Sequence, residues 1–159
     1  MASTGGPIAF VVPSLGEGGA ERVTVYLANA MAARGIECLV VLTGRAGTLR
    51  AQLDQRVTVV EIAAAGVFRA IPRLAKVIRI VQPAALISIM DHTNLAVWSA
   101  RLLARADARL LFTSHVDCNF AFRELPAWLR AIVVALYRPI YRRADVRVAI
   151  SGGVADSLA

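Results

Sequence analysis

The chain alternates short, strongly apolar runs with longer segments whose apolar residues recur at helical spacing, and this alternation limits the folds available to it. The first run, Ile8 to Val12, is closed by Pro13 and is typical of a strand buried on both faces. Five further strands are predicted at residues 37–43, 57–62, 84–90, 109–114 and 145–150. Because these strands alternate with helical segments, we predict an α/β fold: a doubly wound parallel sheet of about six strands, with right-handed crossovers and helices on both faces.

The helical segments follow from apolar spacing and from their stop signals. The first helix, residues 20–34, has apolar residues at Val23, Leu27, Ala30 and Met31 and is followed by Gly35. Other helices are predicted at residues 48–53, 68–81, 93–104 and 125–143. Pro139 is expected to kink or break the last of these, and Ser151 is expected to cap a terminal helix.

Length and composition indicate a single domain. A chain of 159 residues with 57% hydrophobic and 18% charged residues can bury a core, which excludes intrinsic disorder. Its apolar runs are too short for a transmembrane helix, and Met1 to Pro7 lacks the features of a signal peptide. We predict a disordered segment at residues 1–6 and one domain over residues 7–159. Because the last helix stops after about two turns, we expect the chain to be cut at a domain boundary.

The charge of the chain points to anionic partners. Eighteen basic residues against eleven acidic ones give a formal net charge of +7. Nucleic acid is the partner we exclude, because the chain has no dense Lys/Arg run, no aromatic RNA-binding pattern and no zinc-finger spacing. Two basic amphipathic helices remain compatible with an anionic membrane surface, through Arg69, Arg73, Lys76, Trp128 and Arg130. The alternative is that these helices pack normally and expose a solvated arginine face.

The loops after the strands are the candidate ligand sites, because ligands of open α/β sheets bind at the carboxyl ends of the strands. The loop after the first strand contains Gly16, Gly18 and Gly19, which allow close approach of a ligand to the backbone before a helix. It lacks the Gly-Lys-Ser/Thr of a phosphate-binding loop, and Glu21 occupies the third glycine position of the dinucleotide pattern. An ordinary turn is the alternative interpretation.

Both histidines of the chain fall at this same edge. His92 follows the fourth strand, and His115 follows the fifth in a loop that also carries Asp117 and Asn119. Each imidazole is either a structural hydrogen-bonding group or a ligand for a sugar hydroxyl or phosphate that can also move a proton. We predict no metal site, because two histidines without a third ligand at a recognised spacing bind metal poorly. Cys38 and Cys118 form no pair, which is typical of a reducing cytoplasm.

Two segments resemble a known family. The opening segment IAFVVPSLGEGGAERVTVYLANAMAARG and the closing segment RADVRVAISGGVADSLA are similar to the N-terminal half of GT-B glycosyltransferases of the GT4-type, group 1 family. The resemblance covers residues 7–159 and implies a Rossmann-like acceptor-side domain. It also implies a second domain, absent from this chain, that carries the E-x7-E element and binds the nucleotide-sugar. The chain alone is therefore expected to be inactive.

The resemblance also implies roles for individual residues. Gly18 and Gly19 would approach the donor phosphates or sugar, and His115 would be the catalytic residue that holds the sugar or acceptor. Glu17, His92, Asp117 and Asn119 would face the acceptor. The implied reaction is a retaining transfer from a nucleotide-diphosphate sugar, without cofactor or metal, to a glycan, lipid-linked or envelope acceptor. The implied location is the cytoplasm, at the inner face of the membrane.

Two other functions stay open from the sequence. One is a non-catalytic Rossmann module that binds a membrane surface or a partner protein. The other is a dinucleotide- or S-adenosylmethionine-binding domain, which would require a third glycine in the first loop and an acidic residue after the second strand. The chain has Thr43-Gly44-Arg45 at that second position, which disfavours this function.

Overall fold

The computed structural model describes residues 5–64, 66–114 and 126–158. Its centre is a six-stranded sheet in the order β3-β2-β1-β4-β5-β6, in which each neighbouring pair is parallel. The strands are β1 (Ile8–Val12), β2 (Cys38–Leu42), β3 (Thr58–Glu61), β4 (Ala85–Ile89), β5 (Arg109–Ser114) and β6 (Val146–Ala149). The predicted α/β class, with a doubly wound parallel sheet, is confirmed. The expected disorder of residues 1–6 falls mostly outside the described ranges and stays a prediction.

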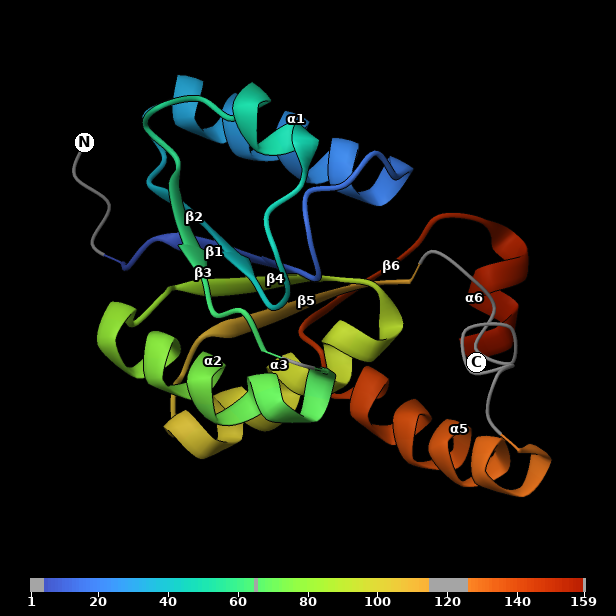
Figure 1. Ribbon diagram of the computed structural model, residues 1–159. Coiled ribbons are helices and arrows are strands. Elements are labelled where there is room, and N and C mark those ends of the chain that lie inside the picture. The colour runs from blue at the N-terminus through green and yellow to red at the C-terminus, as the bar shows by residue number, and fades with distance from the viewer. Residues whose placement is uncertain (1–4, 65, 115–125, 159) are drawn as a thin grey trace.

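Helices cover both faces of the sheet (Figure 1). On one face lie α1 (Gly19–Ala33) and the short 3-10 helix η1 (Thr48–Gln52), and on the other lie α2 (Val67–Val81), α3 (Asp91–Ala104) and α5 (Ala127–Arg142). A last helix, α6 (Gly152–Leu158), follows β6, and Ser151 caps it as predicted, because its Oγ accepts a hydrogen bond from the Val154 amide at 3.3 Å.

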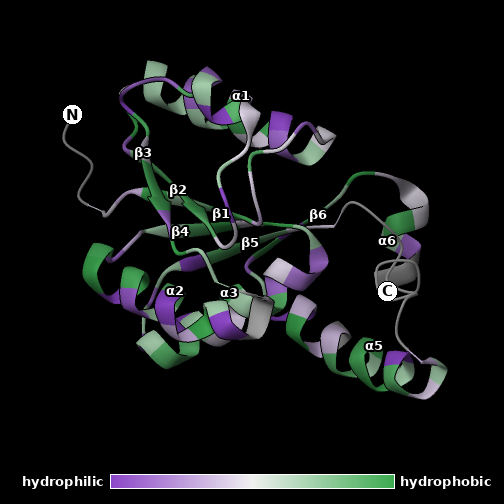
Figure 2. Ribbon diagram, viewed as in Figure 1, coloured by the Kyte–Doolittle hydropathy of each residue, from purple (hydrophilic) through white to green (hydrophobic). Residues whose placement is uncertain are grey.

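The alternating side chains of the strands form two separate hydrophobic cores. Phe10 and Val12 of β1 point toward α1, whereas Ala9 and Val11 point toward α2 and α3. Figure 2 shows the strands as the most continuously hydrophobic part of the ribbon. The inner strands β1, β2, β4 and β5 are mostly buried, which is the physical reason that their sequences are almost continuously apolar, whereas the edge strands β3 and β6 are largely exposed.

The packed face of α1 differs from the one that its large apolar residues suggest. Val23 and Leu27 are exposed, and the buried positions are occupied by small residues and by Thr24 and Val25. Thr24 is tolerated there because its hydroxyl donates to the Ala20 carbonyl at 2.9 Å. Small side chains allow the helix to lie close to the sheet. The spacing of the apolar residues therefore predicted the helix correctly but not the side of it that packs against the sheet.

Pro139 does not break α5. The helix runs through it to Arg142. Pro139 and Ala135, whose carbonyl loses its normal helical partner, both lie on the exposed side of the helix. Water can therefore solvate that carbonyl. Of the two predicted effects of Pro139, the break is wrong, and the kink stays a prediction.

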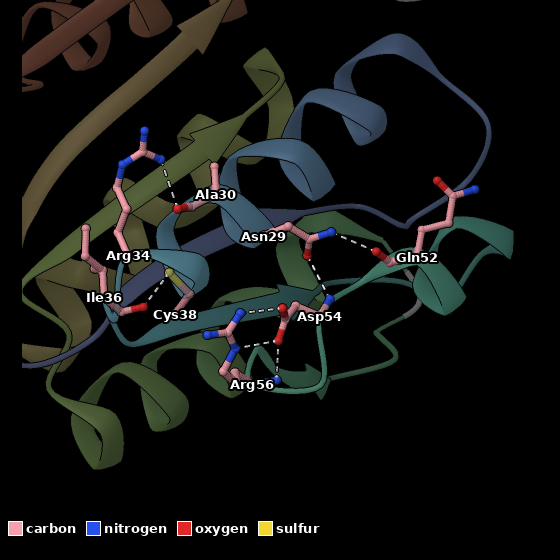
Figure 3. Close-up of polar contacts among 8 residues, drawn as sticks. All are labelled: Asn29, Ala30, Arg34, Ile36, Cys38, Gln52, Asp54 and Arg56. Atoms are coloured by element: carbon pink, nitrogen blue, oxygen red, sulfur yellow. Dashed lines mark hydrogen bonds and ion pairs between the residues drawn. The ribbon is translucent and has the colours of Figure 1, made fainter.

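A polar clamp joins α1 to the turn before β3 (Figure 3). The Asn29 side chain donates to the Gln52 carbonyl at 2.8 Å and accepts from the Asp54 amide at 2.8 Å. Asp54 also receives two bonds from the Arg56 guanidinium, and these bonds hold the pKa of the Asp54 carboxyl well below its usual range. The clamp fixes the path of the chain between η1 and β3.

We expect Asn29→Ala to lower the free energy of unfolding by about 1–2 kcal/mol, because one substitution removes both the donor and the acceptor of the clamp. Urea denaturation would measure the change. Gln52→Ala is the matched control, since Gln52 contributes its backbone carbonyl to the clamp and its side chain is exposed. An equal loss of stability in both variants would contradict the proposed importance of the clamp.

Candidate functional site

The reversal of strand order places the candidate site between β1 and β4. These strands are neighbours, but the chain leaves β1 toward α1 on one face and leaves β4 toward α3 on the other (Figure 1). The N-termini of α1 and α3 therefore flank the same carboxyl edge of the sheet. This is the switch point at which open α/β sheets bind ligands.

The loop between β1 and α1 is held by its neighbours. Leu15 is fully buried, and its carbonyl accepts a hydrogen bond from the Leu49 amide at 3.0 Å. A Cβ on Gly47 would collide with that carbonyl, so Gly47 must be glycine for the two backbones to approach this closely. The loop that precedes α1 thus has a defined shape.

Gly18 and Gly19 stand at the N-terminus of α1, where the sequence predicts them. Gly18 is the N-cap residue in an extended conformation that any residue adopts, and no side chain caps the helix there. A Cβ on Gly19 would meet no atom of the described residues within 4 Å. A Cβ on Gly18, in contrast, would collide with a carboxyl oxygen of Glu21, so the Glu21 carboxylate occupies the space beside Gly18. The backbone is therefore open to a ligand at Gly19, and the amides of a helix N-terminus suit an anionic group. Glu17 is exposed in the same loop.

The connection from β4 to α3 is unusually tight. Met90, the N-cap residue of α3, has φ 78°, a conformation that is strained for a residue with a side chain. The helix starts at Asp91, so His92 lies in its first turn rather than in a loop. His92 is exposed at the surface of this turn. Partial desolvation of its imidazole lowers the pKa of His92, and the negative charge of Asp91 acts in the opposite direction.

A buried polar group lies beneath this turn, and we call it the Asp91 cluster: Asp91, Asn94, Ser114 and Tyr137. Asp91 is only 2% exposed, and one of its carboxyl oxygens accepts hydrogen bonds from the hydroxyls of Ser114 and Tyr137, both at 2.7 Å. Asn94 donates to the Tyr137 hydroxyl at 2.8 Å and to the Thr113 carbonyl at 3.1 Å. The cluster joins the start of α3, the end of β5 and the middle of α5.

Burial dominates the electrostatics of the Asp91 cluster. Desolvation raises the pKa of Asp91, although the hydrogen bonds from Ser114 and Tyr137 and the charge of His92 act in the opposite direction. Close by in the sequence, the buried atoms Ser88 Oγ, Thr93 Oγ1 and Asn94 Oδ1 have no hydrogen-bond partner among the described residues. Such a concentration of polar atoms under a sheet edge is typical of a functional site rather than of a core.

The other predicted site residues divide into two groups. His115, Asp117 and Asn119 lie outside the described residues, as does Cys118, so their roles stay predictions. Arg69, Arg73, Lys76 and Trp128 are exposed on α2 and α5, whereas Arg130 is half-buried. Arg73 donates to the Ile62 and Ala63 carbonyls, so it also stabilises the turn before α2. Among the described residues, no three His, Cys, Asp or Glu side chains gather as metal ligands.

The sequence reasoning missed the Asp91 cluster. One signal could have found it: three polar residues, Asp91, Thr93 and Asn94, follow directly on an apolar strand, where a buried helix start is expected. Tyr137 carried no such signal, because it lies among apolar residues within α5.

Comparison with known proteins gives a family and a fold. A family model described as Glycosyltransferase Family 4 matches residues 17–159. The structure of HepE from Anabaena in complex with UDP and glucose superposes with a TM-score of 0.70 at 19% identity, over 96% of this chain and 40% of that one. The lipopolysaccharide outer core galactosyltransferase WaaB superposes with a TM-score of 0.67 at 16% identity, over 96% of this chain and 41% of that one. No curated protein sequence matches the chain significantly.

Proposed function

Because this chain belongs to glycosyltransferase family 4, we propose that it is the acceptor-binding half of an enzyme that transfers a sugar from a nucleotide-diphosphate sugar to a glycan, lipid-linked or envelope acceptor. The family match over residues 17–159 carries the proposal. The open backbone at Gly19, on the carboxyl edge of the sheet, supports it, because this edge is where the sugar and its phosphates would lie.

In the proposed enzyme, this chain binds the acceptor and a second domain binds most of the donor. The chain spans about 40% of the length of HepE, whose structure was solved with UDP bound. We infer that a second domain, with the E-x7-E element, binds most of the donor nucleotide. The 159-residue chain alone would then bind acceptor but not catalyse transfer.

The proposed chemistry retains the anomeric configuration. The acceptor would attack the sugar from the face that the diphosphate leaves, and the departing phosphate would take the acceptor proton. His115 would hold the transferring sugar, while Gly18 and Gly19 would offer backbone amides to the developing phosphate charge. Glu17, His92, Asp117 and Asn119 would bind the acceptor. The proposed reaction uses no metal and no cofactor, and its proposed location is the cytoplasm at the inner face of the membrane.

The proposal is tested by measuring the release of nucleoside diphosphate from a panel of UDP- and GDP-sugars with a mixed pool of glycan and lipid acceptors. The complete gene product is expected to turn over one donor, and the 159-residue chain is expected to turn over none. Anomeric analysis of the product by NMR would test retention. Absence of turnover by the complete gene product with every donor would favour the non-catalytic module.

Gly19→Ala offers a sharper test of the donor side. The new methyl group meets no atom of the described residues, and alanine is a better helix former, so stability is expected to stay equal or rise by up to about 1 kcal/mol. Turnover by the complete gene product is expected to fall roughly tenfold if a phosphate or sugar contacts this backbone. Gly153→Ala in α6 is the matched control, since its Cβ also meets open space. Unchanged turnover for Gly19→Ala would remove this residue from the donor site.

A further inference from the structure

A groove lies at the carboxyl edge of the sheet, on the β2 side of the β1–α1 loop. It has a volume of about 470 Å³ and is lined by Gly44 and Arg45 after β2 and by Ala63 and Ala64 after β3. Three of these residues have a methyl side chain or none, so they leave space next to Arg45. Because β2 is the neighbour of β1, the groove borders the candidate site, on the edge where sheets of this kind bind ligands.

The backbone on the β2 side of the groove is tied to both neighbouring loops. The Gly44 amide donates to the Pro13 carbonyl at 2.8 Å, and the Ala64 amide donates to the Thr43 carbonyl at 2.9 Å. A Cβ on Gly44 would lie 2.8 Å from the same Pro13 oxygen, so this close approach requires glycine. Arg45 therefore follows a backbone position with a defined place at the sheet edge.

The turn on the β3 side of the groove is strained and is held by a second arginine. Ala63 has φ 40°, in the left-handed region that a residue with a side chain adopts at a cost. Arg73 of α2 donates to the carbonyls of Ile62 and Ala63 at 2.9 and 3.1 Å. Backbone strain that neighbouring groups maintain is concentrated at functional sites. The shape of the groove is thus imposed from both sides.

Arg45 carries a positive charge next to this groove. The segment between β2 and α2 contains three arginines and two acidic residues. Arg50 pairs with Glu61. Arg56 pairs with Asp54 (Figure 3). Arg45 is exposed, and no carboxylate in the described ranges lies within ion-pair distance of it, so its guanidinium is available to an external anion.

We propose that this groove binds an anionic group of the acceptor, a phosphate or a carboxylate, and that Arg45 supplies the opposite charge. A guanidinium presents a planar fork of donors that matches two oxygens of either group. The position suits this role, because an arginine near it accepts the 2′-phosphate in sheets of this kind that bind NADP. The inference rests on the proposed function, since it assumes that the acceptor lies along this edge.

The anionic group would lie away from the reacting hydroxyl of the acceptor. Neighbouring strands are about 4.8 Å apart, so the groove between the ends of β2 and β3 lies roughly 10 Å along the edge from the switch point between β1 and β4. An interaction at that distance is made equally in the ground state and in the transition state. Arg45 would therefore select the acceptor and affect KM more than kcat.

The test is an NMR titration of the 159-residue chain with glucose, glucose 6-phosphate and glucuronic acid at constant ionic strength. The wild type is expected to bind at least one of the two anionic sugars about tenfold or more tightly than glucose, and the one that binds identifies the anion as phosphate or carboxylate. Arg45→Gln is expected to abolish this preference. Arg45→Lys is expected to keep part of it, since lysine retains the charge but not the fork.

Arg56→Gln is the matched control, because it removes the same charge before β3, at the opposite edge of the sheet. It is expected to leave the preference for an anionic sugar unchanged. Equal losses in Arg45→Gln and Arg56→Gln would mean that net charge alone attracts the anion, and they would overturn the proposal. Equal affinity of the wild type for all three sugars, or absence of binding, would overturn it as well.

The anion site is tested apart from sugar transfer, because the titration requires no donor. Selective binding of an anionic sugar, without transfer by the complete gene product, would keep the anion site and reject the enzyme. Transfer with the same KM for acceptor in the wild type and in Arg45→Gln would keep the enzyme and reject the anion site.

Discussion

Replacing Asp91 by alanine is expected to lower the free energy of unfolding by roughly 2–4 kcal/mol, a large share of the stability of a small domain. Asp91 is buried, and its carboxyl oxygen is the acceptor for the hydroxyls of Ser114 and Tyr137. Without it, both hydroxyls lose a hydrogen-bond partner inside the protein, and three elements lose their common contact. Urea denaturation followed by circular dichroism would measure the change.

Asp107→Ala is the control for loss of a carboxylate. Asp107 is fully exposed and lies 3.7 Å from Arg101, a geometry that contributes little. A loss of stability in Asp91→Ala no larger than in Asp107→Ala would show that the Asp91 cluster does not hold the fold together.

Asp91→Asn separates the hydrogen bonds from the charge. The amide oxygen can still accept from both hydroxyls, so this variant is expected to lose less stability than Asp91→Ala. Because the pKa of Asp91 is raised in the folded protein, the folded state binds the proton more tightly than the unfolded state. The stabilisation from that proton is complete below the ordinary pKa of about 3.9 and is lost as the pH rises through the raised value. Asp91→Asn cannot titrate here, so its stability relative to the wild type is expected to improve as the pH rises over this interval.

Replacing His115 by alanine is expected to lower the turnover of the complete gene product by at least about tenfold, with the thermal midpoint of unfolding unchanged. Ser114, the residue before it, is the last residue of β5 and is fixed to Asp91, so the chain enters this position from a rigid strand. The proposed role is to hold the transferring sugar and to stabilise charge in the transition state, which affects kcat more than KM.

His92→Ala provides the comparison for His115→Ala. Its exposed imidazole belongs to the proposed acceptor side, so its loss is expected to raise the KM for acceptor while kcat changes less. Near-normal turnover in His115→Ala would reject the catalytic assignment. A lowered thermal midpoint would indicate a structural role instead.

The sequence predicted most of the fold because the inner strands of the parallel sheet are buried on both faces and are therefore mainly apolar. The strands β1 and β5 lie at their predicted limits, Ile8–Val12 and Arg109–Ser114, and each of the other four strands is one residue shorter at both ends than predicted. The packed side of α1 was not predictable from apolar spacing, since small residues face the sheet and Val23 and Leu27 face outward. Which side packs depends on how closely the helix approaches the sheet, and no local pattern records that distance.

The candidate site was predicted only in part, for a related reason. Gly18 and Gly19 could be placed because a loop after a strand and before a helix has a known position on the sheet edge. The Asp91 cluster depends on Tyr137, which lies 46 residues from Asp91 along the chain, and such a contact exists only in the folded state. His115, Asp117 and Asn119 stay predictions.

The helix α5 contacts the sheet edge on one side and is exposed on the other. The Tyr137 hydroxyl reaches Asp91 at the switch point, while the far side of the same helix bears Trp128, Ile132 and Leu136. Whatever binds the outside of α5 and whatever binds at the sheet edge therefore act on one shared element. Thermodynamic linkage makes any coupling between the two positions reciprocal. If contact with α5 changes the affinity for a ligand at the sheet edge by some factor, that ligand changes the affinity of α5 for its contact by the same factor.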